Sequence, residues 1–186
     1  MHKLLLHICC APCGGGCTER LTERESITPV LYYSNSNLCS KEEFDRRLAS
    51  VRHLAEARGL ELEVDPYDHE AWLRAISGFE DSPEGGDRCS RCFAFNLKRT
   101  AMRAAEKKLD FSTTLTVSPR KSSKKIFAEG EKFSGFVPRD FKKQEGYKRS
   151  CEIAKELGFY RQNFCGCEFS KRDDSPKNKD KNEHEA

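Results

Sequence analysis

No hydrophobic run in this chain of 186 residues is long enough to cross a membrane. The apolar stretch from Leu4 to Ile8 is too short for the core of a secretory signal peptide. Charged residues make up 34% of the sequence, which favours a well-solvated surface. We therefore expect a cytoplasmic protein with no membrane partner.

The chain also lacks a large excess of charge of one sign. Its 33 Lys and Arg residues face 30 Asp and Glu residues, for a net charge of +3. Basic residues concentrate in three segments, 98–108, 120–125 and 142–149. A solvated helix face explains any one of them. Together they permit an anionic partner such as RNA without requiring one.

Internal repeats are absent as well, and the length suits one domain with a full hydrophobic core. We assign residues 1–170 to that single domain. Beyond Ser170 the sequence is Lys, Asp, Glu and Asn with almost no apolar residue. Such a composition predicts a disordered charged tail over residues 171–186.

Strand and helix patterns alternate along the domain. Apolar or alternating segments at 4–8, 28–33, 60–64 and 110–117 predict strands, with a short further strand at 135–137. Helices are expected at 18–24, from the capping-box sequence at Ser40 to Gly59, at 70–76, from Asp87 onward, and at 150–157. This order predicts an α/β fold with a parallel sheet flanked by helices. Ligands of such sheets bind beyond the carboxyl ends of the strands, so we expect a metal site there.

Cysteine is abundant, with ten residues, and four of them fall in the segment from Cys9 to Cys17 beside three consecutive glycines. Thiolates are soft metal ligands, and glycines would let the backbone turn tightly past an ion or cluster. Secreted disulfide scaffolds are usually smaller and carry a signal peptide. Intracellular disulfides remain the alternative, but metal binding is favoured.

Six of the cysteines form three close pairs that are far apart in the chain. One tetrahedral zinc ion or one iron–sulfur cluster needs only four ligands. Either some of the six are structural, or a second metal or a redox-active dithiol lies beside the first site. Cys13 is a possible seventh member because it forms a C-x-x-C motif with Cys10. The pairs are Cys9/Cys10, Cys89/Cys92 and Cys165/Cys167.

The spacing of these pairs differs from that of a zinc ribbon, whose two knuckles lie about 15–20 residues apart. A site built from pairs so far apart forms only when the chain folds, which favours a functional centre. Cys89 and Cys92 open a helix beside arginines, where thiolates are stabilised. Burial as a pair of small hydrophobic residues is the alternative for them. Hydroxyls and cations from Ser118 to Lys125 suit a phosphate or polar base, although a solvated loop explains them nearly as well.

In this order the motifs resemble the cobalamin-independent epoxyqueuosine reductases, the QueH family. The matching segments are His7-x-Cys9-Cys10-Ala11-Pro12-Cys13, 33–37, Cys89-x-x-Cys92, 111–115 with Ser118-Pro119, and 160–170 with Cys165-Gly166-Cys167. The chain departs from the family pattern locally. Leu38-Cys39-Ser40 stands where Ile-His-Pro is usual, and Gly14 follows Cys13 where Ser is common. Cys39 is either a substitute for that histidine or incidental, and no family motif includes Cys17 or Cys151.

The resemblance implies an iron–sulfur enzyme of tRNA modification. Its reaction would be the two-electron reduction of epoxyqueuosine to queuosine at the wobble position, the last step of queuosine biosynthesis. Its partners would be a tRNA with a GUN anticodon carrying epoxyqueuosine and an electron donor that the sequence does not identify. The implied fold is Rossmann-like and related to nucleotide α-hydrolases, which agrees with the strand and helix pattern.

The resemblance also suggests roles for individual residues. Cys9, Cys10, Cys89 and Cys92 are expected to bind a [4Fe–4S] cluster. Cys165 and Cys167 would complete it or hold a second, mononuclear iron. The expected catalytic residues are Cys13 and three proton-donor candidates, Asp87, Asp110 and Tyr160. The expected substrate or tRNA contacts are Tyr33, Asn35, Asn37, Thr113, Thr114, Lys121 and Gln162, with Tyr33 or Tyr160 stacking on the flipped-out base.

Two other functions fit parts of the sequence. A zinc-dependent RNA-binding module without catalysis would explain the cysteines and the basic segments. It would not explain why so many thiols converge on one sheet edge. An ATP-dependent tRNA-thiolating enzyme would carry a Ser-Gly-Gly-x-Asp-Ser loop after the first strand. The sequence there is Cys10-Ala-Pro-Cys13-Gly-Gly-Gly, which argues against it.

Overall fold

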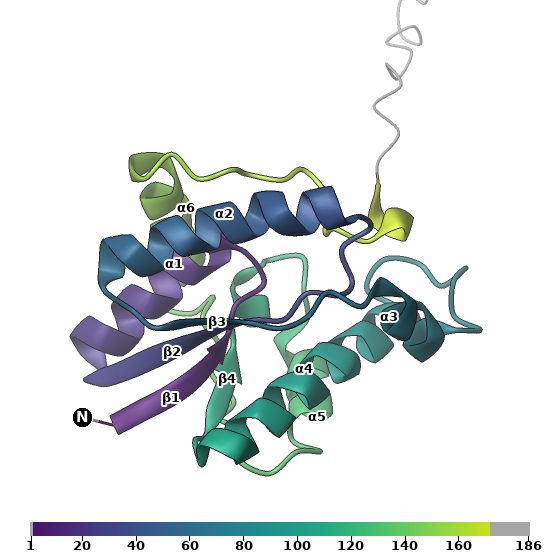
Figure 1. The fold of residues 1–186 in the computed structure, drawn as a ribbon, viewed down its shortest axis with the longest axis horizontal. Helices are drawn as coiled ribbons and strands as arrows, with labels where there is room; N and C mark the ends of the chain where they lie inside the picture. Colours follow the sequence, from purple (N-terminus) through teal and green to yellow (C-terminus); the bar gives the residue numbers. More distant parts are fainter. Residues whose placement is uncertain (1, 172–186) are drawn as a thin grey trace, which may run out of the picture.

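The computed structural model describes residues 2–171, which form a parallel four-stranded sheet with helices on both faces (Figure 1). The strands are β1 (His2–His7), β2 (Ile27–Tyr33), β3 (Leu62–Val64) and β4 (Phe111–Thr113). Their order is β3-β2-β1-β4, so the chain changes direction across the sheet between β1 and β4. This confirms the predicted Rossmann-like α/β class. It also places the topological switch point beyond the carboxyl ends of β1 and β4.

Alternation along the strands divides the core into two layers. Leu4 and Leu6 of β1 pack with helices α1 (Ala11–Glu19), α2 (Lys41–Arg58) and α6 (Gly146–Glu156). Leu5 points to the other face, toward α4 (Asp87–Lys107) and α5 (Ser123–Gly130). Helix α3 (His69–Ile76) packs against α4. Because β1 is covered on both faces, it reads as a continuous apolar run rather than an alternating one.

Capping residues set the bounds of several helices. Ser40 Oγ accepts a hydrogen bond from Glu43 N at 3.2 Å, and α2 ends at Gly59 with φ of +61°. These are the two ends that the sequence predicted. In the same way, Asp68 Oδ1 accepts from Ala71 N at 2.9 Å at the start of α3.

Other bounds differ from prediction. The helix after β1 begins at Ala11 and continues as a π-helical segment, η1 (Arg20–Arg24), instead of spanning 18–24. Strand β4 ends at Thr113, where a 3-10 segment, η2 (Thr114–Val117), takes over. The short strand at 135–137 is only a single bridge from Phe136 to Phe111. Helix α6 begins four residues before the predicted start, and the last described element is η3 (Glu168–Ser170).

The three consecutive glycines have a packing role that the sequence analysis missed. They lie within helix α1 and not in a loop that turns past a metal. A Cβ on Gly15 would lie 2.7 Å from Ile153 Cγ2 of α6, and one on Gly14 would lie 2.4 Å from Ile8 Cδ1. The glycines therefore let α1 approach both α6 and the sheet closely. This close packing fixes the helix whose first turn carries the N-terminal cysteines.

Among residues 2–171, no helix combines the length and apolar character needed to cross a membrane. Apart from Lys171, the predicted charged tail lies outside the described residues.

Substituting Gly15 with alanine should lower the free energy of unfolding by about 1–3 kcal/mol, because the added methyl group overpacks against the buried, branched Ile153. Urea unfolding measures the loss. The Ile153→Ala variant provides the control, because its own cost and that of Gly15→Ala should not add in the double variant. Simple additivity would contradict the proposed contact.

Acid should weaken the attachment of β3 to α4. Arg103 Nε donates to Glu63 Oε2 at 2.6 Å, and Arg103, with Lys107, lowers the pKa of Glu63 to about 2. A carboxyl group with a lowered pKa stabilises the fold above its unfolded-state value near 4.5, and that contribution is lost as the pH falls toward 2. In acid titrations monitored by circular dichroism, Glu63→Gln should therefore flatten the decline of stability over this range. Arg103→Gln should flatten it too. A wild-type slope in Glu63→Gln would contradict this assignment.

Candidate functional site

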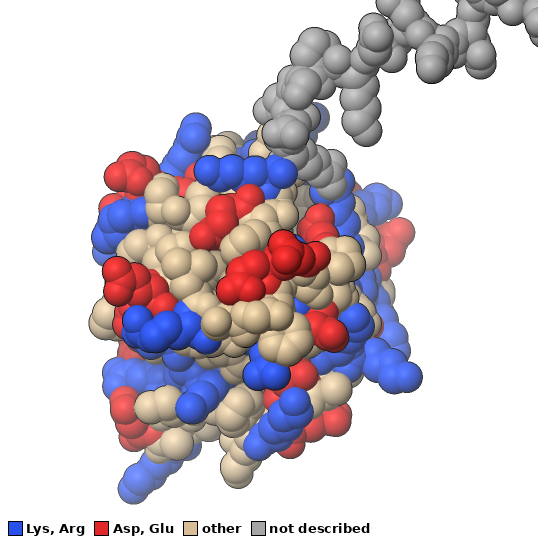
Figure 2. Space-filling model, turned by 90° about the vertical axis from the view of Figure 1, so that its right-hand side faces the viewer, with Lys and Arg blue, Asp and Glu red and all other residues tan. Residues whose placement is uncertain are grey.

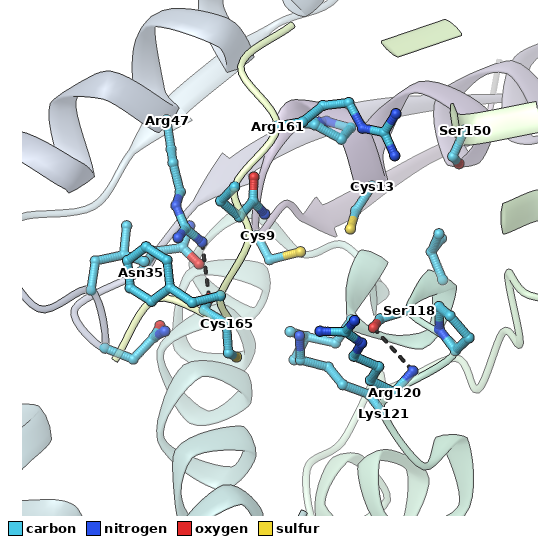
Figure 3. A pocket seen from close by; sticks show the side chains of 18 of the residues that line it. Cys9, Cys13, Asn35, Arg47, Ser118, Arg120, Lys121, Ser150, Arg161 and Cys165 are labelled. Carbon is cyan, nitrogen blue, oxygen red and sulfur yellow. Dashed lines mark hydrogen bonds between the residues drawn. The ribbon is translucent and has the colours of Figure 1, made fainter. Parts of the chain in front are cut away.

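A cavity of about 400 Å³ lies at the switch point of the sheet. Its walls come from the segments that follow β1, β2 and β4, from the first half of α4, and from residues 161–165 near the end of the described chain. Figure 3 shows Cys9, Cys13 and Cys165 in this cavity, together with basic side chains from several of these segments. Segments far apart in the sequence thus meet at the carboxyl ends of the strands, where the sequence predicted a metal site.

Three thiols form a compact group on the β1 side of the cavity. The Sγ atoms of Cys9, Cys10 and Cys13 lie within 4.8 Å of one another. Cys9 ends the connection from β1, Cys10 is the N-cap of α1, and Cys13 lies in the first turn of that helix. We call these three residues the N-terminal thiol group. In the described part of the chain, no other three His, Cys, Asp or Glu side chains come so close together.

Hydrogen bonds within this group favour one thiolate. The thiols of Cys13 and Cys9 donate to the sulfur of Cys10, and with Gln162 Nε2 at 3.2 Å they hold the pKa of Cys10 well below its usual value. The same bonds raise the pKa of Cys13 and Cys9, because those thiols act as the donors. Cys10 also lies at a helix N-terminus, where the macrodipole favours negative charge. A thiolate at Cys10 is therefore available to a soft metal in the folded protein.

Of four further cysteines, Cys92 and Cys165 line the cavity, whereas Cys89 and Cys167 do not. Burial raises the pKa of Cys92, and the charges of neighbouring thiols raise it further. Cys92 also packs beside Cys167, next to Trp72 of α3. The neighbours that act on Cys92 are Cys165, Cys167 and Cys89. We call these four cysteines the C-terminal thiol group, since Cys165 and Cys167 lie near the end of the described chain.

The cavity connects the two groups. Cys92 and Cys165 of the C-terminal thiol group line it, and so do Cys9 and Cys13 of the N-terminal group. One member of each cysteine pair thus lines the cavity, and Cys13 lines it with them. The structure places Cys13, rather than Cys89 and Cys92, beside Cys9 and Cys10. Seven thiols in two groups offer soft ligands for more than one four-coordinate centre.

A buried histidine supports the connection that carries Cys9. His7 Nε2 lies 3.0 Å from the Ser34 carbonyl oxygen, and Nδ1 lies 2.8 Å from Thr113 Oγ1. The carbonyl can only accept, so Nε2 carries the hydrogen and Nδ1 accepts from the threonine hydroxyl. Burial lowers the pKa of His7, in keeping with a neutral ring. Next to it, Thr114 Oγ1 accepts from Cys9 N at 3.1 Å and donates to Cys9 Sγ at 3.4 Å.

Arg47 of α2 holds the segment with Cys165 and Cys167 in place. Its buried guanidinium donates to Glu43 Oε1 at 2.7 Å and to the carbonyl oxygen of Cys165 at 2.9 Å. Gly166 has φ of +131°, and a Cβ there would lie 2.4 Å from Leu38 Cδ2 and 3.0 Å from Arg47 Nη1. Cys39 N donates to the Gly166 carbonyl at 2.9 Å. Glycine is therefore required between Cys165 and Cys167, because a Cβ there would clash with Leu38 and Arg47.

Amide side chains line the cavity between the thiol groups. Asn96 is buried on α4, one turn after Cys92, and its Nδ2 donates to Asn37 Oδ1 at 3.1 Å. Asn96 Oδ1 and Gln162 Oε1 have no partner among the described residues. Asn35 also lines the cavity, and its Nδ2 donates to the Ile8 carbonyl at 2.9 Å. Unpaired buried acceptors are costly, so these amides are suited to a polar ligand.

Lys121 is the cation most closely linked to the thiols. Burial by itself would lower the pKa of Lys121, but its electrostatic interaction with nearby cysteines outweighs this and raises it. The thiols are Cys165, Cys9, Cys13 and Cys10, which belong to both groups. Lys121 therefore keeps its charge in the cavity and offsets that of the thiolates.

Several residues expected in the site lie elsewhere. Tyr33 is fully buried on the α1 and α2 side of β2, with its hydroxyl donating to the Phe44 carbonyl at 3.0 Å. A ring in that position cannot stack on a base, so this prediction is wrong. Asp110 precedes β4 and is exposed at the amino end of the sheet, opposite to the cavity. It is therefore too remote to donate a proton in the cavity.

The other two proton-donor candidates also lie outside the cavity lining. Asp87 is an exposed residue in the first turn of α4. Tyr160 donates to Glu43 Oε2 at 3.4 Å, and Arg46 lies over its ring. Thr113 and Thr114 are buried and hold His7 and Cys9, so they support the site without lining it. The proton-donor roles of Asp87 and Tyr160 and the substrate contacts of Thr113 and Thr114 stay predictions.

The positions of the remaining cysteines show which of them line the cavity. Cys17 of α1 is buried in the core, and Cys39 is half-buried and does not line the cavity. Cys151 of α6 belongs to no family motif, but it lines the cavity beside Arg161.

Some functional candidates were missed in the sequence. Asn96 follows Cys92 by four residues on one helix, a spacing that places both on the same face and could have identified it. Arg47 lies within the apolar face of α2, where no local pattern distinguishes a buried arginine from an exposed one. Trp72, whose indole N–H lowers the pKa of Cys92 against the effect of burial, has no sequence signal linking it to a cysteine of another helix.

Comparison with known proteins identifies close relatives. The family model for epoxyqueuosine reductase QueH matches residues 4–173. Epoxyqueuosine reductase QueH of Streptococcus pyogenes serotype M1 is 38% identical over 181 residues, covering 90% of this chain and 70% of that protein. The protein of the same name from Thermotoga maritima is 35% identical over 180 residues, covering 91% of both chains. That from Staphylococcus epidermidis is 33% identical over 183 residues, covering 90% of this chain and 76% of the relative.

The packing at Gly166 gives a test of the site's scaffold. Gly166→Ala should lower the free energy of unfolding by about 1–3 kcal/mol for overpacking against Leu38 and Arg47, in addition to the backbone strain of about 1–3 kcal/mol at a positive φ. Gly78→Ala is the matched control, because Gly78 has φ of +81° but no atom within 4 Å of an added Cβ. Urea unfolding should show a larger loss for Gly166. Equal losses would mean that only backbone strain matters there.

Proposed function

The chain belongs to the epoxyqueuosine reductase QueH family, and from this premise we propose that it reduces epoxyqueuosine to queuosine at the wobble position of tRNA. The reaction removes the epoxide oxygen as water and leaves an alkene, with two electrons and two protons consumed. The observation that carries the proposal is the N-terminal thiol group, whose three sulfurs lie within 4.8 Å of one another, beside a cavity that Cys92 and Cys165 also line at the switch point of the sheet.

We propose that the two thiol groups hold separate metal centres. The C-terminal thiol group supplies four cysteines, the number that a [4Fe–4S] cluster requires. The N-terminal thiol group supplies three, which would leave a coordination position open on a mononuclear iron. The lowered pKa of Cys10, set by its thiol donors, fits metal binding, since the thiolate is the ligand form. This division replaces the expected grouping of Cys9 and Cys10 with Cys89 and Cys92.

When bound, these centres would pass electrons one at a time and polarise a C–O bond of the epoxide as a Lewis acid. The protein side chains bind and orient the substrate. Asn35, Asn37, Asn96 and Gln162 present amide groups to the modified base or its ring hydroxyls. Of the aromatic residues that line the cavity, Phe164 and Tyr147 take over the stacking role expected of Tyr33 and Tyr160.

Lys121 is a further proton-donor candidate, and it lines the cavity, which Asp87, Asp110 and Tyr160 do not. Interaction with the cysteines of both thiol groups raises the pKa of Lys121, so its Nζ is protonated. Transfer of the Nζ proton to the oxygen of the opened epoxide would supply one of the two protons that the reaction consumes. The same charge stabilises the negative oxygen before the transfer.

The partner we propose is a tRNA with a GUN anticodon, which places the protein in the cytoplasm. The modified base must leave the anticodon stack to enter the cavity, as is usual for enzymes that act on a base. A separate donor must supply the two electrons.

Replacing Cys13 with serine should reduce both iron content and turnover, the latter at least about tenfold, because the N-terminal thiol group then keeps only two thiols. Anaerobically purified protein would be assayed for iron per chain, for absorbance near 400 nm, and for conversion of epoxyqueuosine in tRNA. Cys17→Ala is the control, since Cys17 is buried in the hydrophobic core and belongs to neither thiol group. Wild-type iron and turnover in Cys13→Ser would refute the assignment, whereas colourless wild-type protein with stoichiometric zinc would refute the iron–sulfur proposal.

A further inference from the structure

Two arginines in the cavity lack the partners that other arginines of this protein have. Arg120 and Arg161 line the cavity, and within residues 2–171 neither has a carboxylate oxygen within 4.0 Å. By contrast, Arg47, Arg99 and Arg103 each donate to a carboxylate. Both side chains are exposed, so water screens their charge in the free protein, and their guanidinium groups are available to an anionic ligand that enters the cavity.

The thiolates do not account for these two arginines as they do for Lys121. The raised pKa of Lys121 reflects thiolates of both thiol groups, so its charge already has a partner. Arg161 approaches a sulfur only at Cys151, with Nη2 at 3.9 Å from Sγ. The backbone N of Arg120 donates to Ser118 Oγ at 3.3 Å, so this contact does not involve the guanidinium group.

The two arginines face the same space from different segments. Arg120 belongs to the turn between η2 and α5, and Arg161 follows α6. In the view of Figure 3, Cys13 lies between Arg161 above and the Ser118–Lys121 turn below. Ser150 lines the same part of the cavity, and its buried Oγ has no partner among the described residues. Glu84 is the one carboxylate among the lining residues, on an exposed turn.

This arrangement suits a phosphate monoanion. Guanidinium groups bind phosphate oxygens through paired hydrogen bonds, and a hydroxyl adds a further donor. The amide-lined part of the cavity, with Asn37 and Asn96, suits the base instead. A cavity of about 400 Å³ falls in the range of small-molecule sites and has room for a base with part of its backbone.

We infer that Arg120 and Arg161 form a phosphate subsite that holds a phosphodiester of the RNA backbone next to the modified nucleoside. The inference rests on the proposed function and makes it more specific: the protein recognises a nucleotide within an RNA chain, and the free nucleoside is a poor ligand. Figure 2 shows one face of the molecule, on which acidic and basic side chains are interspersed.

The test measures binding of an epoxyqueuosine-bearing anticodon stem–loop RNA by fluorescence anisotropy. Arg120→Gln and Arg161→Gln should each weaken binding by about tenfold or more, because each removes a charge-assisted contact. Each should also reduce the slope of log affinity against log salt by about 0.7, the value for one phosphate in a single strand. Arg161→Lys keeps the charge and should retain part of the affinity. Arg52→Gln, on the exposed face of α2, is the control and should match wild type.

A change in the RNA identifies the phosphate. Methylphosphonate linkages on either side of the modified nucleotide remove the backbone charge there. They should weaken binding to the wild-type protein about tenfold and leave binding to the Arg120→Gln/Arg161→Gln variant unchanged, since the contact is already lost. The free nucleoside should bind wild type and variant equally weakly. Inorganic phosphate should compete only at concentrations far above those of the RNA.

Three results would overturn the subsite. One is equal weakening by methylphosphonate in wild type and variant. Another is displacement of the RNA by inorganic phosphate at comparable concentrations, which would mean a site for free phosphate. The third is unchanged RNA affinity with reduced iron content, which would mean that the arginines balance thiolate charge. Failure of the wild-type protein to convert the epoxide would instead count against the proposed function, because these binding measurements do not depend on turnover.

Discussion

The site depends on a buried imidazole that ties three strands together. His7 ends β1, donates to the Ser34 carbonyl after β2, and accepts from Thr113 at the end of β4. The bond to the Ser34 carbonyl requires a hydrogen on Nε2, and burial favours the neutral ring, in which Nδ1 accepts from Thr113. The carboxyl ends of the three strands are thereby held in register at the point where the chain leaves β1 for the cysteines. Thr114 extends this support to Cys9 itself.

From that point two arms of protein enclose the cavity. Helix α1 carries the N-terminal thiol group and is held against α6 by glycines, so its first turn has little freedom to move. On the other side, Arg47 and Gly166 fix the segment with Cys165 and Cys167 against α2 and the loop after β2. Rigid supports of this kind suit metal ligands, whose positions must be set before the metal is bound. The charge in the cavity is then a balance between thiolates, Lys121 and the two unpaired arginines.

Much of the fold could be read from local signals. The apolar runs gave β1 and β2, and the Ser40 cap and Gly59 gave both ends of α2, because these features depend on neighbours in sequence. The glycines of α1 were misread, since a run of glycines after a strand is equally compatible with a turn and with a helix pressed against another helix. Only the position of Ile153, far along the chain, decides between them. Tyr33 was misplaced for a related reason: Tyr32 and Tyr33 look alike in sequence, but the alternation of β2 sends them to opposite faces.

By itself the sequence determined the α/β class, the three cysteine pairs and the edge of the sheet where they meet, since each follows from residue type and strand order. Tertiary structure alone decided how the thiols are divided, because Cys13 joins Cys9 and Cys10 only through the turn of α1. It also decided which polar residues face the cavity. Asn96 and Arg161 line it, while Asp110 lies at the far end of the sheet. The physical reason is that composition fixes which contacts are possible, whereas the charge, burial and direction of a side chain depend on elements that are distant in sequence.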